Sequence, residues 1–175
     1  MKGMKRLLPL LLLAALGPAA AFGQVSALKG HDSDAPVDVA ADRIEVQDRA
    51  DRAIFTGNVV VRQGQLTLTA PRLTVAYSSG GGVQLRRIDA TGGVTVRSPS
   101  ETARGDVGIY DTQKRIITLI GGVSLVQKDA KVNGGRLTID LTSGRAVMDG
   151  GGPPGTSRQG GRVTGTFTVP PRSGG

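Results

Sequence analysis

A short glycine-led strand recurs along the chain and constrains its fold more than any other feature. Each copy is a glycine followed by a valine-rich alternation, and the copies start 35 and 29 residues apart, at residues 57–61, 92–96 and 121–125. Gly150 stands a further 29 residues along and marks a weaker fourth copy. A second apolar alternation begins 15 or 16 residues after each of the first three glycines. Each unit is therefore a pair of short strands, and the units must stack into one antiparallel sheet, since a lone hairpin is marginal in water.

This pattern predicts an all-β domain with almost no helix. Apolar residues nowhere recur at helical spacing over three turns. The repeated glycines suit bends or bulges inside strands, because no helix follows them as it would in a phosphate-binding loop. Pro71 interrupts a strand-like stretch and permits only a bulge, a strand end or an edge there. The apolar run 116–120 suits a strand buried on both faces or a bend of the sheet.

The first 21 residues have the features of an export signal. A basic start precedes an apolar run over residues 7–21, which ends in an A-x-A cleavage site, and Gly23 is a second candidate end. The run is short for a membrane span, which needs about 20 apolar residues. We expect an exported, periplasmic protein that starts at Phe22 or Gln24; an uncleaved anchor is the alternative.

The rest of the chain divides at polar and glycine-rich stretches. The predicted parts are a flexible lead-in at 22–35, a sheet domain at 36–149, a glycine- and proline-rich loop at 150–161, a last strand at 162–169 and a tail at 170–175. A disordered tail that begins at residue 150 is the alternative for the last strand.

Charge and composition exclude several functions. Three of the 22 basic residues lie in the signal, which leaves 19 against 14 acidic residues, a net charge of +5. These charges are scattered and aromatic residues make up only 3%, so nucleic acid is not expected as a partner, whereas an anionic partner met by spread arginines is favoured. The chain has no cysteine and a single histidine, His31. We therefore expect no enzyme, no metal site and no cofactor.

Period-2 alternation assigns one set of small side chains to the inner face of the sheet. The candidate lining residues are Val37, Val39, Val59, Val61, Leu66, Leu68, Leu73, Val75, Val94, Val96, Tyr110, Ile117, Leu119, Leu137 and Ile139. They make either an ordinary dry core or a trough that holds an acyl chain, and both interpretations stay open. The parity of one strand is also open, because either Val107 and Ile109 or Gly108 and Tyr110 face inward.

Residues 55–64, which read FTGNVVVRQG, resemble the F-T-G-N-V-x-V-x-Q-G signature of the LptA (OstA) family of periplasmic lipopolysaccharide-transport proteins. Residues 36–42 are similar to the opening strand of that family. Residues 70–73 are similar to its A-D-x-L pattern, with Pro71 in place of the acid. Residues 162–170 are similar to its terminal strand. The resemblance covers residues 36–149 and that last strand.

The resemblance implies a twisted, open β-jellyroll that holds the lipid A acyl chains of lipopolysaccharide inside and its sugars outside. It implies docking to inner-membrane and outer-membrane lipopolysaccharide-transport proteins, and head-to-tail self-association. Val37 and Val39 would meet the inner-membrane partner, and Val163 and Phe167 would meet the next jellyroll. An inner-membrane-anchored relative of the same pathway and a non-enzymatic exported β-repeat scaffold are the alternatives.

Overall fold

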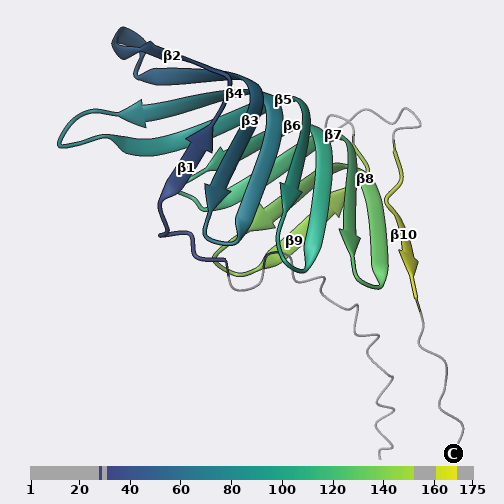
Figure 1. Ribbon diagram of the computed structural model, residues 1–175. Helices are drawn as coiled ribbons and strands as arrows, with labels where there is room; N and C mark the ends of the chain where they lie inside the picture. The colour runs from purple at the N-terminus through teal and green to yellow at the C-terminus, as the bar shows by residue number, and fades with distance from the viewer. Residues whose placement is uncertain (1–27, 29–30, 152–160, 169–175) are drawn as a thin grey trace, which may run out of the picture.

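The computed structural model describes residue 28 and residues 31–151 and 161–168, which contain one antiparallel sheet of ten strands (Figure 1). The strands are β1 (Val37–Ala40), β2 (Arg43–Gln47), β3 (Arg52–Gln63), β4 (Leu66–Ser78), β5 (Gln84–Arg97), β6 (Glu101–Asp111), β7 (Ile116–Gln127), β8 (Ala130–Asp140), β9 (Arg145–Asp149) and β10 (Thr164–Phe167). Within these residues the only helix is a 3-10 turn, Asp48–Ala50. The all-β prediction is confirmed. The predicted export signal and tail lie outside the described residues.

The sheet is folded along a line that crosses the middle of its long strands. Strands β3 to β8 pair in chain order, and each of their pairings shifts register near mid-strand. Strands β1 and β2 both pair with β3, on opposite sides of this line, and β10 and β9 pair with β8 in the same way. We call the side that holds β1 and β10 the β1 half, and the side that holds β2 and β9 the β2 half. The hairpin turns of both halves lie away from the fold line, on the open side of the molecule (Figure 1).

The glycines of the sequence repeat form this fold line. Gly57, Gly92 and Gly121 sit inside the register shifts of β3, β5 and β7, with φ angles of 82°, 92° and 83°. This part of backbone space favours glycine, which has no Cβ to clash. The interpretation of the glycines as bulges is therefore confirmed. Pro71 sits in the corresponding shift of β4, where no ladder hydrogen bond is required of it.

Two of the bulge glycines, Gly57 and Gly121, are each covered by an aspartate side chain. The Asp42 N–H donates to the Gly57 carbonyl at 2.9 Å, and the Asn58 Nδ2 donates to the Asp42 carboxylate at 2.9 Å. The Asp106 carboxylate occupies the space that a Cβ at Gly121 would need. At Gly92 the corresponding neighbour is Pro71, whose Cγ would lie 3.1 Å from such a Cβ. Pro71, which replaces the acid of the family pattern, thus covers Gly92 as the aspartates cover Gly57 and Gly121.

We expect Gly121→Ala to lower the free energy of unfolding by about 1–3 kcal/mol. Alanine is strained at a φ of 83°, and its methyl group would collide with the Asp106 side chain. Chemical denaturation would measure the loss. The matched control is Gly122→Asn, because Gly122 has a φ of 47° and open space around it, and Asn58 already holds the equivalent position in β3 at a φ of 43°. Equal losses in both variants would contradict this account of the fold line.

The buried side chains of both halves form one apolar cluster. Leu73 and Leu137 of the β2 half and Val59 and Val94 of the β1 half are 0–1% exposed within it. The run 116–120 alternates between buried and half-buried side chains and leads directly into the bulge of β7, so it marks a bend of the sheet. No helix in the described ranges is long and apolar enough to cross a membrane.

Strand β6 resolves the parity that the sequence left open. Gly108 and Tyr110 face inward and are buried, whereas Val107 and Ile109 are half-buried on the outer face. A Cβ at Gly108 would lie 3.0 Å from the Val94 Cγ1 and 3.2 Å from a Leu119 methyl group. The inward position therefore holds a glycine because the two halves approach too closely there for a side chain.

Candidate functional site

All fifteen candidate lining residues face the inside of the folded sheet. Thirteen of them are buried, and Val37 and Val39 in β1 are half-buried. The assignment of inner and outer faces is therefore confirmed. The thirteen buried side chains fill the space between the two halves at 0–8% exposure, so the interior is closed along most of its length. Lipid binding by these residues stays a prediction.

Accessible space occurs at the end of the sheet that begins with β1. A cavity of about 520 Å³ lies there between β1 and strands β3 to β5, and we call it the mouth. Its apolar lining consists of Ala35, Val37, Val39, Ala53, Phe55, Val75, Tyr77, Val83, Leu85 and Ile88, and its polar lining of Ser33, Asp34, Gln63 and Thr112. This volume lies within the range of about 300–1,000 Å³ that small-molecule sites occupy. The mouth is thus an apolar site large enough for part of an acyl chain.

The mouth narrows toward the interior. A closed gap of about 20 Å³ shares Val37, Gln63 and Ile88 with the mouth and ends against Leu68 and Ile117. Tyr110 also lines this gap, and burial raises the pKa of its phenol, although hydrogen bonds with Gln63 and Ser33 oppose the shift. The interior therefore continues from the mouth as a row of aliphatic side chains with little free volume.

Sequence reasoning missed several residues of the mouth. Phe55, Leu85 and Ile88 line it, and they lie in the β2 half, where the assignment of the inner face used Leu73 and Val75 of β4 but no residue of β3 or β5. Ile44 and Val46 in β2 are each 56% exposed and pair with the inward residues Phe55 and Ala53. An exposed apolar strip on an edge strand therefore borders the mouth.

The predicted docking residues lie at the two ends of the sheet. Val37 and Val39 belong to β1, which pairs only with β3 among the described strands. Phe167 belongs to β10, which pairs only with β8 in the same set, and Val163 precedes that strand. Phe167 is 59% exposed and Val163 is 43% exposed. Each end of the described sheet thus offers backbone groups for strand addition, while docking itself stays a prediction.

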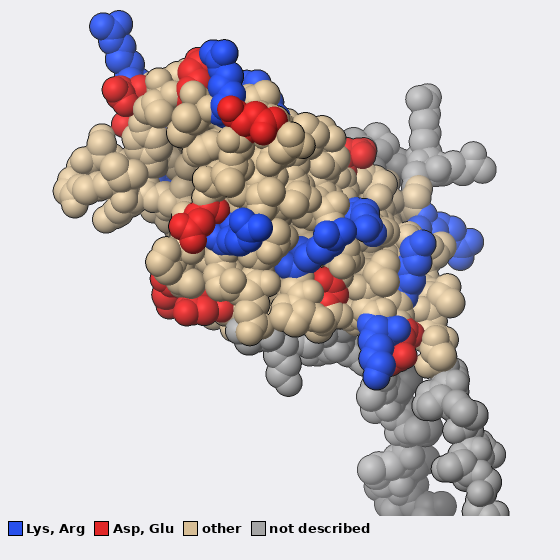
Figure 2. Space-filling model, viewed as in Figure 1, with Lys and Arg blue, Asp and Glu red and all other residues tan. Residues whose placement is uncertain are grey.

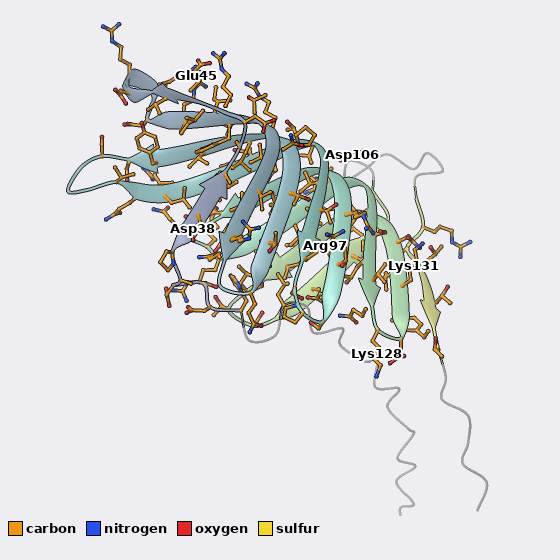
Figure 3. The ribbon with its side chains drawn as sticks, viewed as in Figure 1. Asp38, Glu45, Arg97, Asp106, Lys128 and Lys131 are labelled. Carbon is orange, nitrogen blue, oxygen red and sulfur yellow. The ribbon has the colours of Figure 1, made fainter. Side chains whose placement is uncertain are left out.

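Three basic side chains align across the outer face of the β1 half. The cross-strand register runs from Arg62 through Thr67 to Arg97, and from there through Thr102 and Val126 to Lys131. Figure 2 shows Lys and Arg side chains along the middle of this face, and Figure 3 labels Arg97 and Lys131 on it. None of the three makes an ion pair with an acid in the part of the chain that the structure describes. Fold geometry thus gathers some of the arginines that look scattered in sequence.

The fold, the apolar interior and the two edges that have no partner among the described strands define an open β-jellyroll with a hydrophobic inside. The chain belongs to the family described as "LptA/(LptD N-terminal domain) LPS transport protein", whose model matches residues 38–145. Protein R00383 of Rhizobium meliloti (strain 1021) is 33% identical over 124 residues, which are 67% of each chain.

Relatives with functional names are also similar to the chain. Lipopolysaccharide export system protein LptA of Haemophilus influenzae is 25% identical over 127 residues, which are 69% of this chain and 74% of that protein. LPS-assembly protein LptD of Yersinia pestis is 40% identical over 81 residues, and the chain spans only 10% of its length.

A solved structure shares the fold. The crystal structure of LptH, described as the LptA homologous periplasmic component of the lipopolysaccharide transport device of Pseudomonas aeruginosa, superposes with a TM-score of 0.68. The match covers 79% of this chain and 99% of LptH, at 19% sequence identity. The expected open β-jellyroll is therefore confirmed.

Proposed function

We propose that this protein is a periplasmic carrier that moves lipopolysaccharide between inner-membrane and outer-membrane transport complexes and shields the lipid A acyl chains in its interior. The observation that carries the proposal is the apolar mouth of about 520 Å³, which leads into a row of aliphatic side chains. Family membership and the names of the relatives support the same function.

The energetics of an acyl chain explain why such a carrier needs a lining of this kind. Exposing a chain of about 12 carbons to water costs about 10 kcal/mol, at about 0.8 kcal/mol for each methylene. An aliphatic surface removes most of this cost wherever the chain lies against it. Because the core side chains are already packed together, we infer that a chain enters at the mouth first and goes deeper only where the two halves separate.

The edge strands supply the bridging part of the proposal. A free strand edge adds a partner strand through backbone hydrogen bonds, and it is a liability for aggregation unless it is used or protected. Strand β1 would receive the inner-membrane partner and β10 the next jellyroll, which is another copy or the outer-membrane partner. The exposed Ile44 and Val46 beside the mouth would be covered by the first of these contacts.

Photo-crosslinking in living cells tests the carrier. A photo-reactive side chain at Val39 or Leu68 should crosslink to lipopolysaccharide, because both residues face inward. The same group at Val60 or Thr67, the outward neighbours, should not. Immunoblotting for lipopolysaccharide after irradiation reads out the crosslinks.

A melting curve should first establish that each labelled protein is folded, especially at the buried Leu68. Equal labelling at inward and outward positions would contradict the carrier. Folded protein that gives no crosslink at Val39 would also contradict it and would favour the scaffold alternative.

A further inference from the structure

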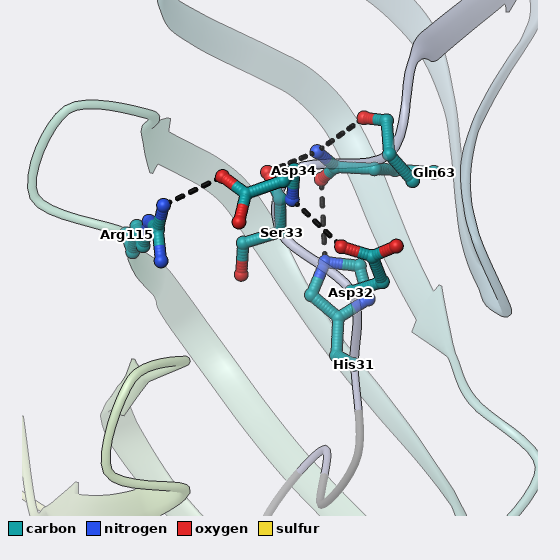
Figure 4. Close-up of polar contacts among 7 residues, drawn as sticks. His31, Asp32, Ser33, Asp34, Gln63 and Arg115 are labelled. Carbon is teal, nitrogen blue, oxygen red and sulfur yellow. Dashed lines mark hydrogen bonds and ion pairs between the residues drawn. The ribbon is translucent and has the colours of Figure 1, made fainter.

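The end of the lead-in crosses the open side of the jellyroll. We call residues 31–36 the strap. The Gln63 Nε2, at the end of β3 in the β1 half, donates to the Ser33 and Ala35 carbonyls at 2.9 and 3.0 Å. An Arg115 guanidinium nitrogen, in the turn before β7 of the β2 half, donates to the Asp34 Oδ1 at 2.6 Å. The strap therefore joins the β1 half to the β2 half on the open side of the molecule (Figure 4).

The strap is also one wall of the mouth. Ser33, Asp34 and Ala35 line the cavity of about 520 Å³ together with apolar side chains of β3, β4 and β5. Further back along the lead-in, Leu28 is 4% exposed, and its N–H donates to the Glu101 carboxylate at the start of β6. An acyl chain that enters the mouth lies against this segment.

The two attachments of the strap differ in kind. The Gln63 side chain is buried and makes two hydrogen bonds to strap carbonyls. By contrast, the Asp34 side chain is 77% exposed and the Arg115 side chain is 41% exposed. An exposed ion pair contributes little to stability, so another anion can replace its acidic member. The attachment at Arg115 is therefore the one that can open.

Arg115 is well placed to receive such an anion. Its backbone is held in the turn by the Leu141 N–H, which donates to the Arg115 carbonyl at 2.9 Å. Its position is thus fixed, while the guanidinium reaches the rim of the mouth through its contact with Asp34, a lining residue. A guanidinium matches the geometry of a phosphate group by donating two parallel hydrogen bonds.

We propose that Arg115 binds the phosphorylated head group of an acyl-chain lipid and that Asp34 occupies this arginine while the protein is empty. Loading then exchanges one anion for another, and the strap moves away from the β2 half while it stays attached at Gln63. This inference rests on the proposed function, because it assumes that the chain of the same lipid lies in the mouth.

Two amphiphiles with the same chain separate head-group binding from chain binding. Dodecyl phosphate and dodecyl maltoside, below their micellar concentrations, are titrated into the protein, and displacement of an apolar fluorescent dye reports binding. We expect Arg115→Gln to lower the affinity for dodecyl phosphate about tenfold, because one charged hydrogen-bonding partner is lost. The affinity for dodecyl maltoside should not change. Asp34→Asn should raise the affinity for dodecyl phosphate several-fold, and the double variant should bind dodecyl phosphate as weakly as Arg115→Gln does.

The matched control is Arg136→Gln, which removes the same charge from an exposed position on the outer face of β8 and should change neither affinity. If both amphiphiles bind and Arg115→Gln changes both affinities equally or changes neither affinity, the inference is overturned while the carrier stands. If neither amphiphile binds the wild-type protein, the carrier and the inference fail together.

Motion of the strap has its own readout. The chain has no cysteine, so Asp32→Cys gives one site for a spin label on the exposed side of the strap. Dodecyl phosphate should increase the mobility of this label, and it should do so less in the Arg115→Gln background. Tight, Arg115-dependent phosphate binding with an immobile label would refute displacement of the strap.

Discussion

Leu119→Asp should prevent the domain from folding. The side chain is 0% exposed at the contact between the two halves, so the aspartate would be buried without a partner. Loss of the leucine alone costs about 2–5 kcal/mol, and an unpaired buried charge adds further cost. Together these reach the total stability of a typical domain, which is about 5–15 kcal/mol. Circular dichroism of the purified protein would show loss of the β-type spectrum.

The informative contrast to Leu119→Asp is Val39→Asp. Val39 is half-buried at the mouth, where a carboxylate can keep contact with water, so this variant should fold and should lose acyl-chain binding. Thr118→Asp, on the half-buried outer face next to Leu119, should retain both properties and controls for charge on β7. If Val39→Asp folds and binds lipid as well as wild type, the mouth is not the entry site. If Leu119→Asp folds with a wild-type melting curve, the interior is not the packed core described above.

Much of this fold could be predicted because two periodicities agree. The two-residue alternation assigned every candidate lining residue except Tyr110 to the inner face, since successive strand side chains point to opposite faces. The spacing of Gly57, Gly92 and Gly121 placed the bulges, because only glycine is unstrained at these backbone angles. Both signals are local, and each is strong because it repeats.

The features that could not be predicted depend on contacts between distant parts of the chain. Gly108 carries no hydrophobic signal, and its inward position follows only from the approach of Val94 and Leu119. The contact between Asp34 and Arg115 joins residues 81 positions apart, and nothing near either residue in sequence indicates the other. The mouth was also missed, because its residues come from both sides of the bulges, from the edge strand β1 and from the strap.

Proline substitution in β1 should separate folding from docking. Successive N–H groups of a strand point to opposite edges, so one of the two N–H groups of Asp38 and Val39 faces β3 and the other faces away from the sheet. Proline removes the N–H at its own position. One of the variants Asp38→Pro and Val39→Pro should therefore lose a ladder bond and melt at a clearly lower temperature. The other should keep nearly the wild-type midpoint, and thermal melts would identify which is which.

The variant that keeps its fold is the decisive one for the bridge. Lipid binding in vitro should persist, because Asp38→Pro leaves the lining side chains unchanged and Val39→Pro keeps an apolar side chain at the mouth. Co-purification with the inner-membrane partner and complementation of an export defect should fail. Asp38→Ala and Val39→Ala change the side chains but keep both N–H groups, so they should complement. If the folded proline variant complements as well as its alanine counterpart, strand addition at β1 is not how this jellyroll meets its partner. The exposed strip of Ile44 and Val46 on β2 would then be the surface to test next.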